Sequence, residues 1–161
     1  MAKKTEVVVV AAGKGLRLKK NIPKAFISLN NRPLVYYCLK TFQKHPKISS
    51  IVLVVEKSQL ARARSIVKRF KLSKVSRIVA GGRQRKDSVA NGLKNVSKTA
   101  SNVLIHDAAR PFVTSALVNS IIKALAKYRF VVPGIPAQDT LKSVDKKGIV
   151  KSTLVRDSVF Q

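Results

Sequence analysis

The sequence has very little cysteine, tryptophan or acid, and it has no long apolar run. Its single cysteine, Cys38, rules out an intramolecular disulfide and a metal cluster built on cysteine. Tryptophan is absent and the chain has six phenylalanines and three tyrosines, too few to predict stacking platforms for single-stranded nucleic acid. No apolar stretch approaches the roughly 20 residues that cross a bilayer. We therefore expect a cytoplasmic protein that does not enter a membrane.

The shortage of acid is the most unusual feature of the composition. The chain has 33 lysines and arginines against 7 acids, which gives a formal net charge of +26 and a pI near 11.0. Such a charge attracts polyanions, so non-specific binding of nucleic acid is one expectation. The basic residues are spread along the chain rather than gathered in one block. That distribution is also typical of a solvated basic surface.

Apolar stretches alternate with stretches of helical periodicity along the 161 residues. Strands are predicted at 6–11, 48–56 and 75–80, within 102–112, and at 130–136, which reads "FVVPGIP". Helices are predicted from Pro33 to Phe42, from a Ser58 cap to Phe70, from Asp87 and Ser88 onward with Val89, Leu93 and Val96 on one face, and after a Thr114 cap. This alternation predicts an α/β fold in one domain, with a Rossmann-like, mostly parallel sheet covered by helices on both faces.

The pattern changes after residue 134. Alternating apolar residues flank a turn at Asp145–Gly148, so we predict a β-ribbon over 135–160. An isolated two-stranded ribbon is marginally stable in water, and this one is therefore expected to pack against something else, such as a second subunit.

Ligands of such sheets bind at the carboxyl ends of the strands. That rule selects four loops: 11–23, 80–88, 106–111 and the segment after Val132. In the first loop, Gly13 and Gly15 let the backbone approach a phosphate group closely. The loop lacks the third glycine of a dinucleotide fingerprint, since position 18 is leucine, and it lacks the Gly-Lys-Ser/Thr of a P-loop. The loop therefore argues against a dinucleotide dehydrogenase and against a P-loop NTPase.

Three motifs carry a resemblance to a known family. "AAGKGLRL" followed by "PKAF" resembles the signature loop of nucleotidyltransferases that activate sugars and sugar alcohols. "GGRQRKDSVANGL" and "HDAARPF" are similar to the motifs of the 2-C-methyl-D-erythritol 4-phosphate cytidylyltransferase family. The resemblance covers essentially the whole chain. It implies that the phosphate of methylerythritol phosphate attacks the α-phosphorus of CTP and that pyrophosphate leaves, the third step of the non-mevalonate isoprenoid pathway.

The resemblance also assigns roles to residues. The transition state would be stabilised by Arg17 and Lys24, and the triphosphate would be wrapped by Ala11, Ala12, Gly13 and Gly15. The "GGRQRKDS" loop would bind the cytosine end of the nucleotide through Gly81, Gly82, Arg85 and Ser88, and methylerythritol phosphate would be bound by Asp107, Ala108, Ala109, Thr140 and Arg156. The triphosphate would itself hold most of the magnesium, and no dedicated protein site for a metal is implied.

Simpler interpretations of the same residues remain open. Gly81–Gly82 is also a turn signal, Asp87–Ser88 a helix start, and Asp107 with Arg110 a brace within one loop. His106 is expected to be structural. The resemblance implies a homodimer through the 135–160 arm, and a single nucleotidyltransferase domain over 1–161 that lacks the family's C-terminal segment. An inactive fragment of an active enzyme is one of the outcomes left open.

Three departures from the family pattern bear on substrate preference: Ala25, Arg83 and Gln138 stand where the family more often has other residues. The alternatives left open are a ribitol 5-phosphate cytidylyltransferase, a basic nucleic-acid-binding protein with this fold, and a non-catalytic remnant.

Overall fold

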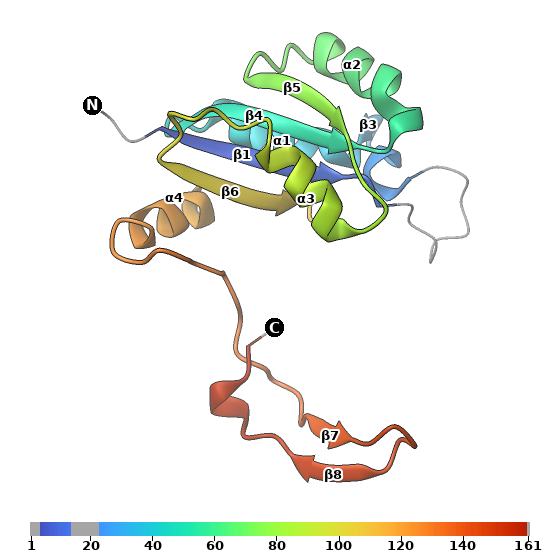
Figure 1. The fold of residues 1–161 in the computed structure, drawn as a ribbon, viewed down its shortest axis with the longest axis vertical. Coiled ribbons are helices and arrows are strands. Elements are labelled where there is room, and N and C mark those ends of the chain that lie inside the picture. The colour runs from blue at the N-terminus through green and yellow to red at the C-terminus, as the bar shows by residue number, and fades with distance from the viewer. Residues whose placement is uncertain (1–3, 14–22, 161) are drawn as a thin grey trace. The chain divides into compact units, whose positions relative to one another are not determined.

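The protein is described by a computed structural model over residues 4–13 and 23–160 (Figure 1). The chain divides into two compact units, Met1–Ile122 and Lys123–Gln161. Within the described ranges, none of the helices combines the length and the apolar character needed to span a membrane.

The first unit is built on a four-stranded sheet in which all neighbours are parallel. Its order is β5-β4-β1-β6, where β1 is Thr5–Ala11, β4 is Ile48–Val55, β5 is Val75–Ala80 and β6 is Asn102–Asp107. Val8 of β1 stands opposite Val52 of β4 and Ile105 of β6. The predicted Rossmann-like α/β fold is confirmed, because continuous apolar runs form strands that are covered on both faces.

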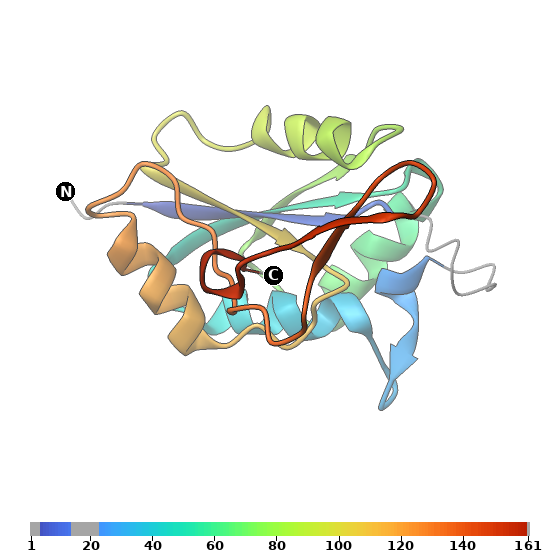
Figure 2. The same cartoon turned by 90° about the horizontal axis from the view of Figure 1, so that it is seen from below.

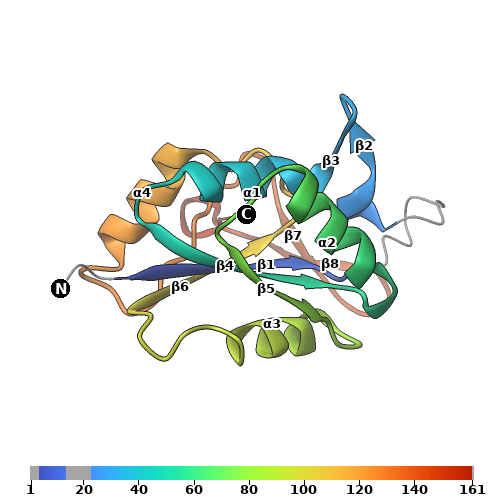
Figure 3. The ribbon, with the colours of Figure 1, turned by 90° about the horizontal axis from the view of Figure 1, so that it is seen from above.

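Helices cover the two faces of this sheet unequally. The helices α1 (Leu34–Lys44) and α2 (Leu60–Arg69) lie on one face, and α3 (Arg85–Leu93) lies alone on the other (Figures 2 and 3). On the α3 side, Val8, Val52 and Val54 form a buried cluster. Their chain neighbours Val7 and Leu53 are equally buried and point to the opposite face, because side chains alternate along a strand.

The helix α3 approaches the sheet closely at Gly92. A Cβ atom added there would overlap Val8 Cγ1 and come within 2.9 Å of Val54 Cγ2. Glycine is therefore required by the distance between the helix and the sheet, although it lowers helix propensity by about 1 kcal/mol. The predicted buried face of this helix is wrong at Leu93, which is exposed, because α3 packs through Ser88 and Gly92 instead.

The helix starts differ from prediction in informative ways. Leu34 begins α1, with Pro33 as its extended N-cap. Ser58 does not cap α2: it lies in a 3-10 turn, Lys57–Gln59, and Gln59 is the N-cap. The Thr114 cap of α4 (Ser115–Ala124) is confirmed, since the Leu117 N–H donates to Thr114 Oγ1 at 3.2 Å.

A short hairpin between the first loop and α1 was not predicted from the sequence. It pairs β2 (Ser28–Leu29) with β3 (Arg32–Pro33). The turn residues Asn30 and Asn31 have φ of 48° and 60°, the left-handed conformation that asparagine tolerates better than most residues. The Asn-Asn pair was the available sequence signal.

The second unit consists of a hairpin and its approaches. Its strands are β7 (Lys142–Val144) and β8 (Val150–Thr153), antiparallel, and the turn between them contains Gly148 at φ 83°. The predicted strand at 130–136 is wrong: the structure has only an isolated bridge, from Pro136 to Phe160. Pro133 and Pro136 cannot donate backbone hydrogen bonds to a ladder, which weakens pairing in this segment.

The close approach at Gly92 predicts the effect of one substitution. Gly92→Ala should destabilise the protein by about 1–2 kcal/mol, because overpacking against Val8 and Val54 exceeds the gain of about 1 kcal/mol in helix propensity. Urea unfolding followed by circular dichroism measures this. Lys86→Ala on the exposed side of the same helix is the matched control and should change stability by less than about 0.5 kcal/mol. A Gly92→Ala protein as stable as the parent would contradict the close approach.

Candidate functional site

The carboxyl ends of β1, β5 and β6 meet at one edge of the first unit, as the sequence predicts. We call this edge the rim and define it by residues 11–13, 80–88 and 106–111. Backbone hydrogen bonds carry the strand pairing into it: the Gly81 N–H donates to Val55 O at 2.8 Å and the Ala108 N–H donates to Val10 O at 2.9 Å. The loops that leave these strands are therefore anchored where they start.

The Gly81–Gly82 turn fits into a tight space at the rim. A Cβ atom on Gly81 would overlap the Ala12 side chain and stand 2.8 Å from Ser88 Oγ, and one on Gly82 would overlap the Asp87 side chain. Both glycines are thus required by the close approach of the first loop and α3. The turn interpretation and a ligand-binding interpretation are compatible.

Ser88 holds this turn from beneath. Its buried hydroxyl accepts the Gly82 N–H at 3.1 Å and donates to Gln84 O at 3.2 Å. Both hydrogen bonds stay within the loop, so Ser88 fixes the shape of the turn. Direct contact between Ser88 and a base remains a prediction.

The start of α3 is set by a capping box rather than by Asp87 and Ser88 alone. Gln84 is the N-cap, its side chain accepts an N–H from the first turn, and Asp87 Oδ2 accepts the Gln84 N–H at 2.9 Å. The spacing is that of a capping box, but glutamine at the N-cap and aspartate three residues later are not its usual residues, so the sequence signal was weak. The N-terminal end of α3, with its partial positive charge, therefore faces the rim.

An ion pair joins two of the predicted loops. Arg85 Nε lies 3.0 Å from Asp107 Oδ1, with the two side chains 63% and 34% exposed. Such an exposed pair stabilises a fold by about 0–1 kcal/mol at most, so its main effect is to set the positions of the two loops. Asp107 and Arg110 also brace their loop, but through the backbone: the Arg110 N–H donates to the Asp107 carbonyl oxygen at 2.9 Å, while the Asp107 carboxylate pairs with Arg85.

His106 supports the same loop from inside the unit. Its Nε2 lies 3.0 Å from the Arg110 carbonyl oxygen, and its ring stands edge-on to Phe42 with centroids 5.2 Å apart. Burial lowers the pKa of His106. The neutral ring therefore donates from Nε2 to Arg110 and fixes the turn after Asp107.

The next two residues of this loop differ in exposure. Ala108 is fully buried and its N–H is bonded to Val10, whereas Ala109 is exposed. Ala109, Arg110 and part of the Asp107 carboxylate face solvent in this loop.

The first loop is described only at its two ends. Gly15 and Arg17 lie outside the described residues. Ala11 ends β1 and is buried, Ala12 is half-buried, and a Cβ atom added at Gly13 would have no described atom within 4 Å.

Lys24 is presented on a firmly packed segment. It is exposed, and it begins a 3-10 turn, Lys24–Phe26, whose other residues Ala25 and Phe26 are buried. Arg62 near the start of α2 donates to Phe26 O at 3.3 Å and lies 5.3 Å above its ring. The turn is thus tied to the rim end of α2.

The two remaining predicted residues, Thr140 and Arg156, belong to the second unit. Both are exposed, and Arg156 Nη1 donates to Gln138 O at 3.0 Å. That bond ties the approach to β7 to the 3-10 turn that follows β8. A joint role with the rim remains a prediction. In the part of the chain that the structure describes, no three His, Cys, Asp or Glu side chains gather as a metal site would require.

The comparisons with known proteins agree on one family. Residues 5–161 match the family described as IspD, 2-C-methyl-D-erythritol 4-phosphate cytidylyltransferase. A relative of that name from Clostridium botulinum (strain 657 / Type Ba4) is 43% identical over 157 residues, which span 98% of this chain and 69% of the relative. Another from Alkaliphilus metalliredigens (strain QYMF) is 38% identical over 161 residues, 99% of this chain and 67% of the relative.

Solved structures show the same likeness. The 4-diphosphocytidyl-2C-methyl-D-erythritol synthase of Anaerococcus prevotii superposes with a TM-score of 0.84 at 28% identity, over 99% of this chain and 67% of that one. The Francisella tularensis 2-C-methyl-D-erythritol 4-phosphate cytidylyltransferase gives a TM-score of 0.75 at 26% identity, over 99% and 69%. The chain thus spans about two thirds of the length of these relatives, and it belongs to the 2-C-methyl-D-erythritol 4-phosphate cytidylyltransferase family.

Proposed function

We propose that this protein transfers the cytidylyl group of CTP to 2-C-methyl-D-erythritol 4-phosphate and releases pyrophosphate. The relatives carry the name of that activity. The structural observation that supports it is the Arg85–Asp107 ion pair at 3.0 Å, because it joins the loop assigned to the nucleotide to the loop assigned to the acceptor. A transfer between two bound substrates requires their sites to be adjacent and fixed.

The Gly81–Gly82 turn is proposed to hold the cytosine ring. Both of its N–H groups are already bonded, to Val55 O and to Ser88 Oγ. The turn is therefore left with carbonyl oxygens to offer, and these suit the amino group of cytosine, which is a hydrogen-bond donor. The absence of side chains at both positions lets a flat ring approach the backbone.

Asp107 is proposed to accept hydrogen bonds from the hydroxyl groups of methylerythritol phosphate. Ionised carboxylate is a pure acceptor, and Arg85 holds one of its oxygens in place. The exposed Ala109 beside it leaves room for the acceptor. Thr140 and Arg156 are proposed to bind the acceptor's phosphate.

The charge that develops on the α-phosphate needs cationic partners. Lys24 is proposed as one, because the buried residues on either side of it fix its backbone while its side chain is exposed. Arg17 is proposed as the second from the family motif alone. Magnesium bound to the triphosphate would neutralise phosphate charge, and since the described rim offers no carboxylate cluster, we propose that phosphate oxygens and water supply most of its ligands.

The hairpin of the second unit is proposed to mediate a homodimer. It exposes Val144, Ile149 and Val150, and an isolated two-stranded ribbon is at best marginally stable. Packing two hairpins together about a two-fold axis would bury these side chains, and two-fold dimers are the commonest soluble assembly.

The proposed activity is tested by following pyrophosphate release from CTP. Release should require both methylerythritol phosphate and magnesium, and phosphorus NMR should show the cytidylyl group joined to the acceptor's phosphate. Ribitol 5-phosphate is the matched control acceptor. Equal or faster release with ribitol 5-phosphate would overturn the assignment of the acceptor, and no release with either would overturn the activity.

The proposed dimer is tested by mixing two damaged proteins. Lys24→Ala and Arg156→Ala should each be nearly inactive. If each active site combines the rim of one subunit with the hairpin of the other, refolding the two together yields mixed dimers with one intact site. Half of the dimers should be mixed under random pairing, so activity should return to about a quarter of the parent level. If the hairpin serves its own subunit, every site keeps one lesion and the mixture stays inactive.

A further inference from the structure

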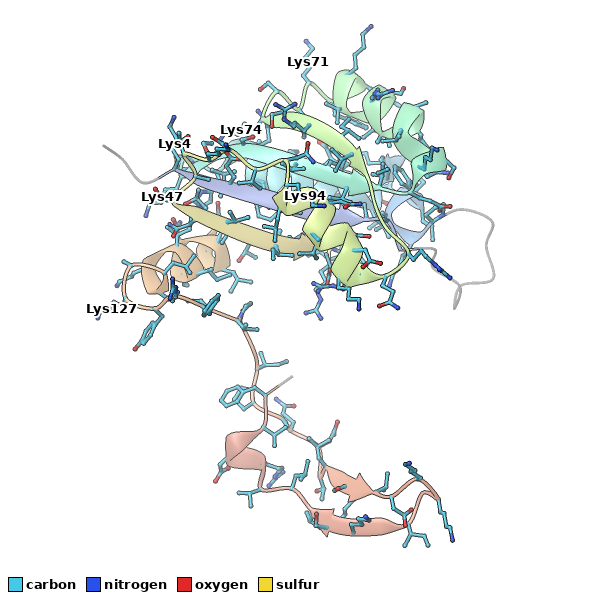
Figure 4. The ribbon with its side chains drawn as sticks, in the orientation of Figure 1. Lys4, Lys47, Lys71, Lys74, Lys94 and Lys127 are labelled. Atoms are coloured by element: carbon cyan, nitrogen blue, oxygen red, sulfur yellow. The ribbon has the colours of Figure 1, made fainter. Side chains whose placement is uncertain are left out.

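The edge of the sheet opposite the rim is lined with lysine. The residue directly before β1 is Lys4, the one before β4 is Lys47, and the one before β5 is Lys74. These strands are neighbours in the sheet, and neighbouring strands lie about 4.8 Å apart. Figure 4 shows the three labelled lysines together at the amino ends of the strands. The order of the sheet thus forms a row of cations that no single stretch of sequence displays.

The helix ends and turns at this half of the unit add further cations. The helices run back from the rim, so α1, α2 and α3 end on this side, on both faces of the sheet (Figure 3). Figure 4 shows Lys71 beyond the end of α2 and Lys94 at the end of α3. We call the whole set the amino-edge surface, which consists of Lys4, Lys44, Lys47, Lys68, Arg69, Lys71, Lys74, Lys94 and Lys98.

Acidic residues are distributed in the opposite way. Of the four acids in residues 1–122, Glu56, Asp87 and Asp107 follow or end strands on the rim side. The fourth, Glu6, is buried, and its carboxylate accepts the Ser97 N–H at 3.3 Å. In the described part of this unit, therefore, no exposed acid stands beside the amino-edge surface. It is not a face of alternating charges that neutralise one another.

Structural roles account for only part of this surface. Cations in the last turn of a helix stabilise it by about 0.3–1 kcal/mol, which covers Lys44, Lys68 and Arg69. Lys74 donates to the His45 carbonyl at 2.7 Å. Neither stabilisation of a helix end nor a hydrogen bond to a carbonyl explains the cations that stand before strands or in turns, which are Lys4, Lys47, Lys71 and Lys98. A row of like charges also opposes folding.

Two local features show that lysine is kept at this edge at a cost. Lys71 has φ 51°, a left-handed conformation in which glycine or asparagine is the less strained choice. Beneath the row, burial lowers the pKa of His45, and the positive charges of Lys74 and Lys47 lower it further. A ligand of negative charge would relieve both the repulsion and this local positive potential.

We propose that the amino-edge surface binds nucleic acid through its phosphate backbone, without reading sequence. A lipid surface is flat and meets one face, whereas these cations lie on the edge and on both faces of the sheet, which suits a strand that bends around them. Exposed aromatic side chains that could stack on bases are missing from the described part of this edge, so contacts to phosphate are what it offers. The surface lies opposite the rim, so binding is independent of the proposed activity.

The proposal is tested by fluorescence anisotropy with a short labelled RNA duplex, and with the DNA duplex of the same sequence as the second arm. The test variant is Lys4→Gln/Lys47→Gln/Lys71→Asn, in which asparagine suits the left-handed position. The control variant is Lys57→Gln/Arg64→Gln/Lys86→Gln, which removes the same charge from exposed positions elsewhere in the unit. Thermal melts establish that both variants fold.

The test variant should bind about 100-fold more weakly near 0.1 M salt, and its log-log salt slope should be smaller by about 2–3. The control variant should keep nearly the parent affinity and slope. Equal losses in the two variants would mean diffuse attraction by the net charge and would overturn the proposal. Binding to vesicles that contain phosphatidylserine is measured in parallel. If the test variant loses vesicle binding but keeps its affinity for both duplexes, the surface binds membranes and the proposal is overturned. A difference in affinity between the RNA duplex and the DNA duplex would show which of the two backbones the surface prefers.

Discussion

The close packing of α3 on the sheet is the constraint on which the rest of the rim depends. At Gly92 the helix touches Val8 and Val54 with no room for a Cβ atom, and at Gly81 the chain before the helix meets Ala12 in the same way. Because the helix lies this close to the sheet, Ser88 is buried and braces the turn, and Arg85 in the first helical turn contacts Asp107. A looser helix would separate the two loops.

Much of this architecture could be read from the sequence, for a definite physical reason. The strands around Val8 and Leu53 are apolar runs, and such runs form the buried central strands of parallel sheets. The edge strand around Ile78 is mixed, since it contains Ser76 and an exposed Arg77, and the two glycines that follow it mark its end. The rim then follows from topology alone, since parallel strands all end at one edge. The motif residues Gly81, Gly82 and Asp107 fell at that edge, as expected.

The errors arose where a tertiary contact or a proline overrules the apolar pattern. Leu93 fits an apolar helical stripe, yet it is exposed because the glycine beside it decides which face can approach the sheet. The segment 130–136 has the composition of a strand but forms no ladder, since Pro133 and Pro136 lack N–H donors. The Arg85–Asp107 pair spans 22 positions, and no local pattern indicates which arginine an isolated aspartate will meet.

The central claim is that the rim binds CTP at the Gly81–Ser88 loop and the acceptor at Asp107–Ala109. Backbone amide chemical shifts measured by NMR during titration test it most directly. CTP with magnesium should shift the amides of residues 11–13 and 81–88, and methylerythritol phosphate added afterwards should shift those of 107–109. If CTP instead shifts only the amides beside Lys4, Lys47 and Lys71, and leaves 81–88 unchanged, the rim is not the nucleotide site.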